Sequence, residues 1–230
     1  MTSVVDPVTP ELREARWVRP FVAIAAVIGL LLLGAAGGLL LGLPGSSEPE
    51  PGPVDIGFSQ DMSVHHLQAV EMAGWERDHT TDPALAQLST DLERTQNNQV
   101  GQMQGWLTLW DAPALPLGGY MGWMADAPGT HDHAGPVDPV TGTVATMPGM
   151  ASTADLQTLR AADGPALDIR FLQLMLRHHQ GGAGMLRYGA EHATVPQVRN
   201  LAAQMLGSQA SEIEYLQQLL AERGGTPLPL

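Results

Sequence analysis

Apolar residues follow two different patterns along the chain. Residues 21–43 form one continuous apolar run without a charged or hydrogen-bonding side chain, and as a helix this run is roughly 34 Å long. After residue 55 the apolar residues instead recur every three or four positions, which predicts amphipathic helices. The sequence therefore predicts an all-α protein in which an N-terminal transmembrane helix precedes a helical domain.

The residues on either side of the apolar run predict its orientation. Arginines precede the run, whereas the linker at residues 44–54 is rich in Pro, Gly, Ser and Glu and has no basic residue. Because basic residues favour the cytoplasmic side, we expect residues 1–20 in the cytoplasm, residues 21–43 in the lipid bilayer and the helical domain outside. A cleaved signal peptide is the alternative, although its apolar core usually has only about 7 to 15 residues.

The helical domain, residues 55–223, contains an internal duplication. Residues 55–110 align with residues 168–223 at a constant offset of 113 positions and without a gap. The residues shared at the start of the two copies are Asp55, Phe58, Gln60, Met62, His65, His66 and Met72 in the first and Asp168, Phe171, Gln173, Met175, His178, His179 and Met185 in the second. Self-similarity of this length indicates a repeated structural unit.

Each copy is predicted to form two helices. The first helix runs from about residue 55 to 79, and again from 168 to 192, before a Thr and a Pro mark a turn and a new helix start. The second helices have apolar stripes. Two amphipathic hairpins bury their apolar faces by packing together, which predicts an internally duplicated four-helix bundle. A connection at residues 111–151 and a short helix at residues 152–163 join the copies.

Methionine and histidine share one side of the first helix in each copy. Met62, His65, His66 and Met72 stand at i, i+3, i+4 and i+10, and this spacing keeps them on one face. A thioether and an imidazole one turn apart suit a soft cation such as Cu(I). The candidate metal ligands are Met62, His65, His66, Met72 and His79 in the first copy and Met175, His178, His179, Met185 and His192 in the second.

Structural roles compete with this interpretation. Methionine on a helix face is more often core packing than a ligand, and His79 and His192 stand at helix ends, where a protonated imidazole also stabilises the helix dipole. The adjacent histidine pairs are harder to explain as packing, because buried imidazoles need hydrogen-bond partners. Candidate partners on the second helices are Gln96, Gln99, Gln209 and Glu212, which a solvated helix edge would also explain. If the histidines are ligands, protons should compete with the metal when the pH falls below about 6.5, the unperturbed pKa of imidazole.

The connection adds further methionine and histidine. These residues are Met121, Met124, His131, His133, Met147 and Met150. A flexible segment of this composition can gather a soft cation, and an ordinary disordered linker is the alternative.

Composition excludes several classes of function. The chain has no cysteine, so that disulfides and thiolate metal sites are excluded and methionine is the source of soft sulfur ligands. Its formal net charge of −13 at pH 7 would repel a phosphate backbone, and we expect no nucleic-acid partner. The sequence identifies no protein partner.

The pattern Asp-x-x-Phe-x-x-x-Met-x-x-His-His at residues 55–66 and 168–179 resembles the bacterial domain of unknown function 305 family. The resemblance covers about residues 55–223. It implies a ferritin-like four-helix bundle that is exported to the cell envelope, has no assigned enzymatic activity and in some members is associated with copper. Family copies often continue with His-x-x-Ala; Ala69 keeps this in the first copy, but Gly182 replaces it in the second. Three glycines at positions 181, 182 and 184 predict a locally weakened helix.

The preferred hypothesis is a membrane-anchored, non-enzymatic protein that binds or buffers copper outside the cytoplasm. A carboxylate-bridged di-iron oxidase is an alternative, because Glu76 and His79 have the Glu-x-x-His spacing of iron-binding bundles. Gly189 stands where the second copy would need its glutamate. A structural or partner-binding bundle without metal is the third possibility.

Overall fold

The structure is a computed structural model that describes residues 18–40, 49–124 and 137–230. Its first helix, α1 (Val18–Leu40), contains a segment at residues 20–39 that is long and apolar enough to cross a membrane. The predicted N-terminal helix is therefore present, and residues 41–43 of the apolar run lie outside the described residues. Residues 1–17 of the predicted cytoplasmic segment and residues 44–48 of the predicted linker lie outside them as well.

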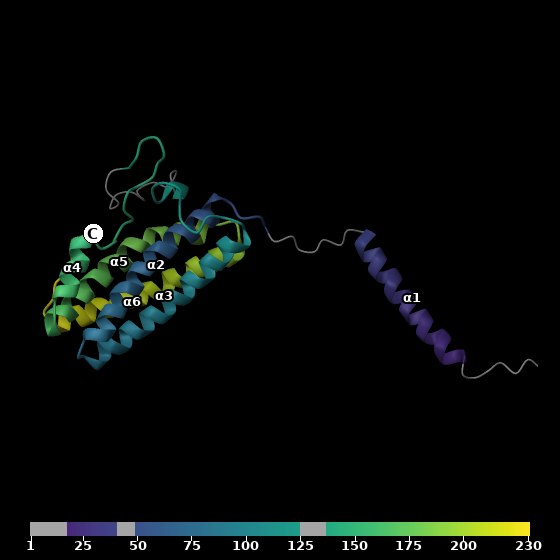
Figure 1. Cartoon of the computed structure of the whole chain (residues 1–230), viewed down its shortest axis with the longest axis horizontal. Helices are drawn as coiled ribbons and strands as arrows, with labels where there is room; N and C mark the ends of the chain where they lie inside the picture. Colours follow the sequence, from purple (N-terminus) through teal and green to yellow (C-terminus); the bar gives the residue numbers. More distant parts are fainter. Residues whose placement is uncertain (1–17, 41–48, 125–136) are drawn as a thin grey trace, which may run out of the picture. The chain divides into compact units, whose positions relative to one another are not determined.

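Four long helices lie side by side in the domain that follows (Figure 1). They are α2 (Pro53–His79), α3 (Pro83–Leu109), α5 (Gly164–His192) and α6 (Pro196–Glu222). Helix α2 pairs with α3, α5 pairs with α6, and α2 contacts α5. Both second helices begin with a proline, and Asp82 caps α3 by accepting a hydrogen bond from the Ala84 backbone N–H at 2.8 Å. The predicted all-α fold is confirmed.

The first aspartate of each copy binds the hairpin turn of the other copy. Asp55, at the start of α2, accepts hydrogen bonds from the backbone N–H groups of Thr194 (3.2 Å) and Val195 (2.8 Å). Asp168, on α5, accepts one from the Thr80 hydroxyl at 2.7 Å. Helices α2 and α5 are therefore antiparallel, and their central turns lie against each other.

The core has two clusters, one toward each end of the contact between α2 and α5. One cluster includes Met62 and Met185, and the other includes Met72 and Met175. The apolar stripes predicted for α3 and α6 contribute to both clusters. Their fully buried members are Leu85, Leu92, Met103 and Leu107 on α3 and Val198, Leu201, Met205, Leu216, Leu219 and Leu220 on α6. The central turns of α2 and α5, which carry the histidine pairs, lie between these clusters in sequence.

The described part of the connection between the copies leads into the second copy through short helical elements. It contains a short 3-10 turn, η1 (Gly122–Met124), and ends at helix α4 (Thr153–Ala161). Helix α4 begins with the Ser152 N-cap and contacts both α2 and α5. The predicted short helix is therefore present.

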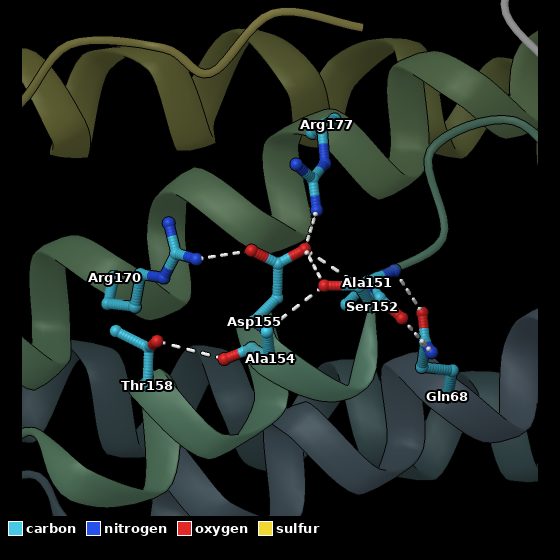
Figure 2. A network of polar contacts seen from close by, with 8 residues as sticks. All are labelled: Gln68, Ala151, Ser152, Ala154, Asp155, Thr158, Arg170 and Arg177. Carbon is cyan, nitrogen blue, oxygen red and sulfur yellow. Dashed lines mark hydrogen bonds and ion pairs between the residues drawn. The ribbon is translucent and has the colours of Figure 1, made fainter.

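Polar contacts fix the end of the connection to both first helices (Figure 2). The Gln68 side chain on α2 accepts a hydrogen bond from the Ala151 backbone N–H at 2.6 Å and donates one to its carbonyl at 2.9 Å. On α4, the Asp155 carboxylate pairs with Arg170 at 2.5 Å and with Arg177 at 2.8 Å, both on α5. The segment just before Ala151 is thus held across the contact between α2 and α5.

Glycines let this segment approach α5 closely. Gly149 adopts φ of +79°, a conformation that favours glycine, and it packs on the backbone of α5 at Gly181. A Cβ atom on Gly181 would overlap backbone atoms of Pro148 and Gly149. Helix α5 continues through Gly181, Gly182 and Gly184 without interruption, and the lower local stability expected from these glycines stays a prediction. Packing, which the sequence pattern does not reveal, accounts for Gly181.

A buried carboxyl group lies beside one of the inter-copy contacts. Glu76 is fully buried on α2, and its neighbours include Asp168, Asp82 and Arg223, of which the last two form an ion pair. Burial raises the pKa of Glu76 to about 8, and the carboxylate of Asp168 adds to this shift. Glu76 is therefore mostly protonated at neutral pH.

Substitution of the glycines should separate packing from helix propensity. We expect Gly181→Ala to lower the free energy of unfolding by about 1 to 3 kcal/mol, because its methyl group has no space. Gly184→Ala is the matched control: nothing lies within 4 Å of its Cβ position, so it should raise stability by about 0.5 to 1 kcal/mol. Urea denaturation measures both. Equal effects of the two substitutions would contradict the described packing.

Stability should decrease as pH rises from 6.5 to 8.5. The pKa of Glu76 is raised in the folded state, so its contribution is complete below the unfolded value of about 4.5 and is lost as pH rises through about 8. We expect a decrease on the order of 1 to 3 kcal/mol over this range. Glu76→Gln should remove most of it. If urea denaturation of the two proteins shows the same pH dependence, Glu76 is not the responsible group.

Candidate metal centre

Two histidines from different copies meet at the centre of the contact between α2 and α5. The rings of His65 and His178 have centroids 3.8 Å apart, with an angle of 36° between their planes. His66 lies beside His65, with centroids 6.4 Å apart, and His179 lies beside His178, with centroids 6.2 Å apart. None of the four residues is more than 1% exposed. We call these four residues the histidine cluster.

The outer histidine of each copy bonds to the second helix of its own copy. His66 Nε2 lies 2.8 Å from the Gln99 side-chain oxygen, and His179 Nε2 lies 2.7 Å from a Glu212 carboxylate oxygen. The two contacts are equivalent, since each joins residues 33 positions apart. Two of the four candidate partners named from the sequence, Gln99 and Glu212, therefore contact the outer histidines.

The other two candidate partners lie in the core without this contact. Gln96 and Gln209 are 3% and 5% exposed. The side-chain nitrogen and oxygen of Gln96 have no hydrogen-bond partner among the described residues, and the same holds for the side-chain oxygen of Gln209.

The connection supplies a third partner. His65 Nε2 lies 3.2 Å from the Pro148 carbonyl oxygen, in the segment that packs on Gly181. Gly182 provides space for the same ring, because a Cβ atom there would lie 2.9 Å from His65 Cε1. The Met-Pro-Gly-Met sequence at residues 147–150 therefore positions the His65 ring through a backbone carbonyl. The methionine side chains of this sequence gave no sign of that contact.

These contacts fix where the ring protons lie. A carbonyl or carboxylate oxygen only accepts hydrogen bonds, so His65 and His179 each donate from Nε2, and the assigned orientation of Gln99 gives His66 the same arrangement. Nδ1 of these three rings, and both ring nitrogens of His178, are buried without a hydrogen-bond partner among the described residues. The cluster therefore holds several buried lone pairs that accept no hydrogen bond from the described residues.

Burial favours the neutral form of three of these imidazoles. It lowers the pKa of His65 to about 4 and that of His66 to about 3, and it lowers the pKa of His178 well below 6.5. The unperturbed value expected from the sequence is therefore too high for these rings. Proton competition for a ligand on His65 or His66 begins near pH 4.

Thioether groups lie on both sides of the histidine cluster along α2 and α5. Met62, Met72, Met175 and Met185 are at most 1% exposed. The core cluster of Met62 and Met185 also contains Met103, Met121, Met124, Met147 and Met205. Met103 on α3 and Met205 on α6 therefore lie in the same core cluster as the candidate ligands Met62 and Met185.

The terminal histidines lie apart from the histidine cluster. His79 is 13 residues after His66 on α2, a rise of about 20 Å, and it is exposed. Its ring stacks on Trp75, and its Nδ1 lies 2.8 Å from the Trp75 carbonyl oxygen. His192 makes the equivalent contacts with Tyr188 at the end of α5.

The methionines of the connection pack in the domain instead of remaining free. Met121, Met124 and Met147 are at most 2% exposed, and Met150 is half-buried. His131 and His133 lie outside the described residues. The described part of the connection therefore packs against the helices of the domain.

The donor set favours nitrogen and sulfur over oxygen. No three His, Asp or Glu side chains within the described residues converge as ligands for one ion. Glu76 is buried, whereas His79 is exposed, so the Glu-x-x-His spacing does not produce a shared iron site. The unused imidazole nitrogens and the buried thioethers fit a soft cation such as Cu(I).

The domain matches a known family in sequence and in fold. The family described as Domain of unknown function (DUF305) matches residues 55–220. A DUF305 protein from Streptomyces coelicolor, named as a candidate secreted protein, is 40% identical; its crystal structure matches 77% of this chain and 98% of its own, with a TM-score of 0.67. A DUF305 fragment from Deinococcus radiodurans is 26% identical, matching 76% of this chain and 99% of its own, with a TM-score of 0.59.

CopM has the same fold at lower identity. Its Cu(I)-bound form is 21% identical, matching 73% of this chain and 96% of its own, with a TM-score of 0.53. CopM has also been solved with Cu(II) and with silver. No curated protein sequence matches this chain. The family match over most of the chain and the 40% identical structure show that the protein belongs to the DUF305 family.

Proposed function

We propose that this protein binds copper through the histidine cluster and the methionines that flank it, and that it stores or buffers the ion without catalysing a reaction. The proposed ligands are His65, His66, His178 and His179 together with Met62, Met72, Met175 and Met185. His79 and His192 remain candidates for a separate, exposed site, because they lie apart from the histidine cluster.

The arrangement of ring protons is the observation that carries this proposal. Histidines that bind metals usually donate their other ring N–H to a carbonyl or carboxylate, which fixes the tautomer and the direction of the lone pair. His65, His66 and His179 make such contacts, with Pro148, Gln99 and Glu212, and keep Nδ1 without a partner. A purely structural histidine would be expected to satisfy both nitrogens when it is fully buried.

The type of ligand supports copper over harder cations. Thioether sulfur and neutral imidazole bind Cu(I) well, whereas calcium and magnesium require oxygen ligands. CopM, which shares the fold, has been solved with Cu(I), Cu(II) and silver bound. Iron is the less favoured alternative, because di-iron bundles need a glutamate with each Glu-x-x-His pair and Gly189 stands where the second copy would supply it.

We further propose that α1 anchors the protein in the lipid bilayer and that the bundle lies outside the cytoplasm. Most side chains of residues 20–39 are exposed and apolar, and lipid would remove this surface from water. The arginines before the helix favour a cytoplasmic N-terminus.

Loss of a histidine pair should weaken Cu(I) binding. We expect His65→Ala/His66→Ala and His178→Ala/His179→Ala each to lower the Cu(I) affinity at pH 7 by at least about tenfold, because each change removes two imidazole ligands. His79→Ala/His192→Ala tests the separate exposed site and should leave the Cu(I) affinity of the histidine cluster unchanged, because these residues lie apart from it. Competition with a chromophoric Cu(I) chelator measures the affinity, and circular dichroism reports helical content. Folded variants that all bind like the parent would show that the pairs are structural.

The anchor proposal predicts both topology and processing. A reporter enzyme fused after Leu230 that is active only outside the cytoplasm should be active, because the arginine bias orients α1. The mature chain should retain α1 and remain in the membrane fraction. A mature N-terminus at residues 44–55 would show instead that the segment is a cleaved signal peptide.

A further inference from the structure

The two copies surround the histidine cluster with groups of different charge. Gln99 and Glu212 occupy equivalent positions, 113 residues apart, and each bonds to the outer histidine of its copy at nearly the same distance, 2.8 and 2.7 Å. One partner is a neutral amide and the other a carboxylate. The geometry is duplicated, but the charge is not.

Glu212 is the one carboxylate within the described residues that hydrogen-bonds to the cluster. The other contacts to the four rings come from neutral groups, the Gln99 amide and the Pro148 carbonyl. The Glu212 side chain is 26% exposed, so that it avoids the full cost of burying a charge. Glu212 is therefore the charged side chain that acts on the cluster through a direct contact with one of its rings.

We propose that Glu212 is a positioning residue that raises the affinity of the histidine cluster for Cu(II) relative to Cu(I). This inference rests on the proposed function. Glu212 acts through His179: it accepts the hydrogen bond from Nε2–H, while Nδ1 of the same ring is buried without a hydrogen-bond partner among the described residues. Gln99 fixes His66 in the same way but adds no charge.

The effect follows from the charge of the ion. The attraction between a carboxylate and a cation scales with the charge of the cation, so that one negative charge stabilises Cu(II) twice as much as Cu(I) at the same distance. A hydrogen bond from Nε2–H to a carboxylate also makes the imidazole a stronger donor to the metal. A partner that only orients the ring would alter the two affinities by the same factor.

Isosteric substitutions test this difference. We expect Glu212→Gln to lower the affinity for Cu(II) by about tenfold more than the affinity for Cu(I), because it keeps the hydrogen bond and removes the charge. The reduction potential of the bound copper should then rise by about 59 mV, the value of a tenfold ratio for a one-electron couple. Gln99→Glu should shift the ratio in the opposite direction. The double variant, which exchanges the two residues, should return it close to the parent value.

The measurement uses the full-length protein in detergent, with separate chelator competitions for Cu(I) and Cu(II) and circular dichroism as the control for folding. If Glu212→Gln lowers both affinities equally, or neither, Glu212 has a structural role and the inference is wrong. A parent protein that binds neither ion would instead contradict the proposed function itself, so the two failures are distinguishable.

Discussion

Burial of four imidazole rings between α2 and α5 is the constraint on which the rest of the structure depends. His65 and His178 contact each other at the centre of this interface, and burial there is compatible only with neutral rings. Buried rings need acceptors for their N–H groups, and each acceptor comes from a different element: Gln99 from α3, Glu212 from α6 and Pro148 from the connection. The histidine pairs therefore organise both hairpins and the segment that covers them.

Duplication explains the symmetry of the site, and the connection explains its departures from symmetry. The chain has one connection between the two copies, and it contacts α2 and α5 differently. It packs on Gly181 of α5, whereas the equivalent residue of α2, Gln68, hydrogen-bonds to Ala151 of the connection. Gly189 similarly replaces the residue equivalent to Glu76, because a Cβ atom at this position would lie 2.6 Å from the Phe58 ring. Such differences reflect local packing more than loss of the repeated pattern.

Much of the fold was predictable from the sequence because it depends on local periodicity. Helical spacing and the Thr and Pro turn signals predicted the two hairpins, and the matching His-His pairs placed two equivalent helices in one core. The partners of the histidines were only partly predictable: Gln99 and Glu212 follow from helical spacing, whereas the Pro148 carbonyl is a backbone atom 83 residues from His65. The stacking of His79 on Trp75 was not predictable either, because helical spacing does not show which residues of a helix face are buried and which are exposed.

The most direct test of the account is to follow the ring nitrogens of the histidine cluster during copper binding. Nitrogen-15 NMR of full-length protein labelled at histidine, titrated with the diamagnetic ion Cu(I), distinguishes Nδ1 from Nε2 in each ring. The account predicts that the Nδ1 resonances of His65, His66 and His179 shift on binding, while their Nε2 atoms keep their protons. Copper binding that leaves all three Nδ1 resonances unchanged would contradict it.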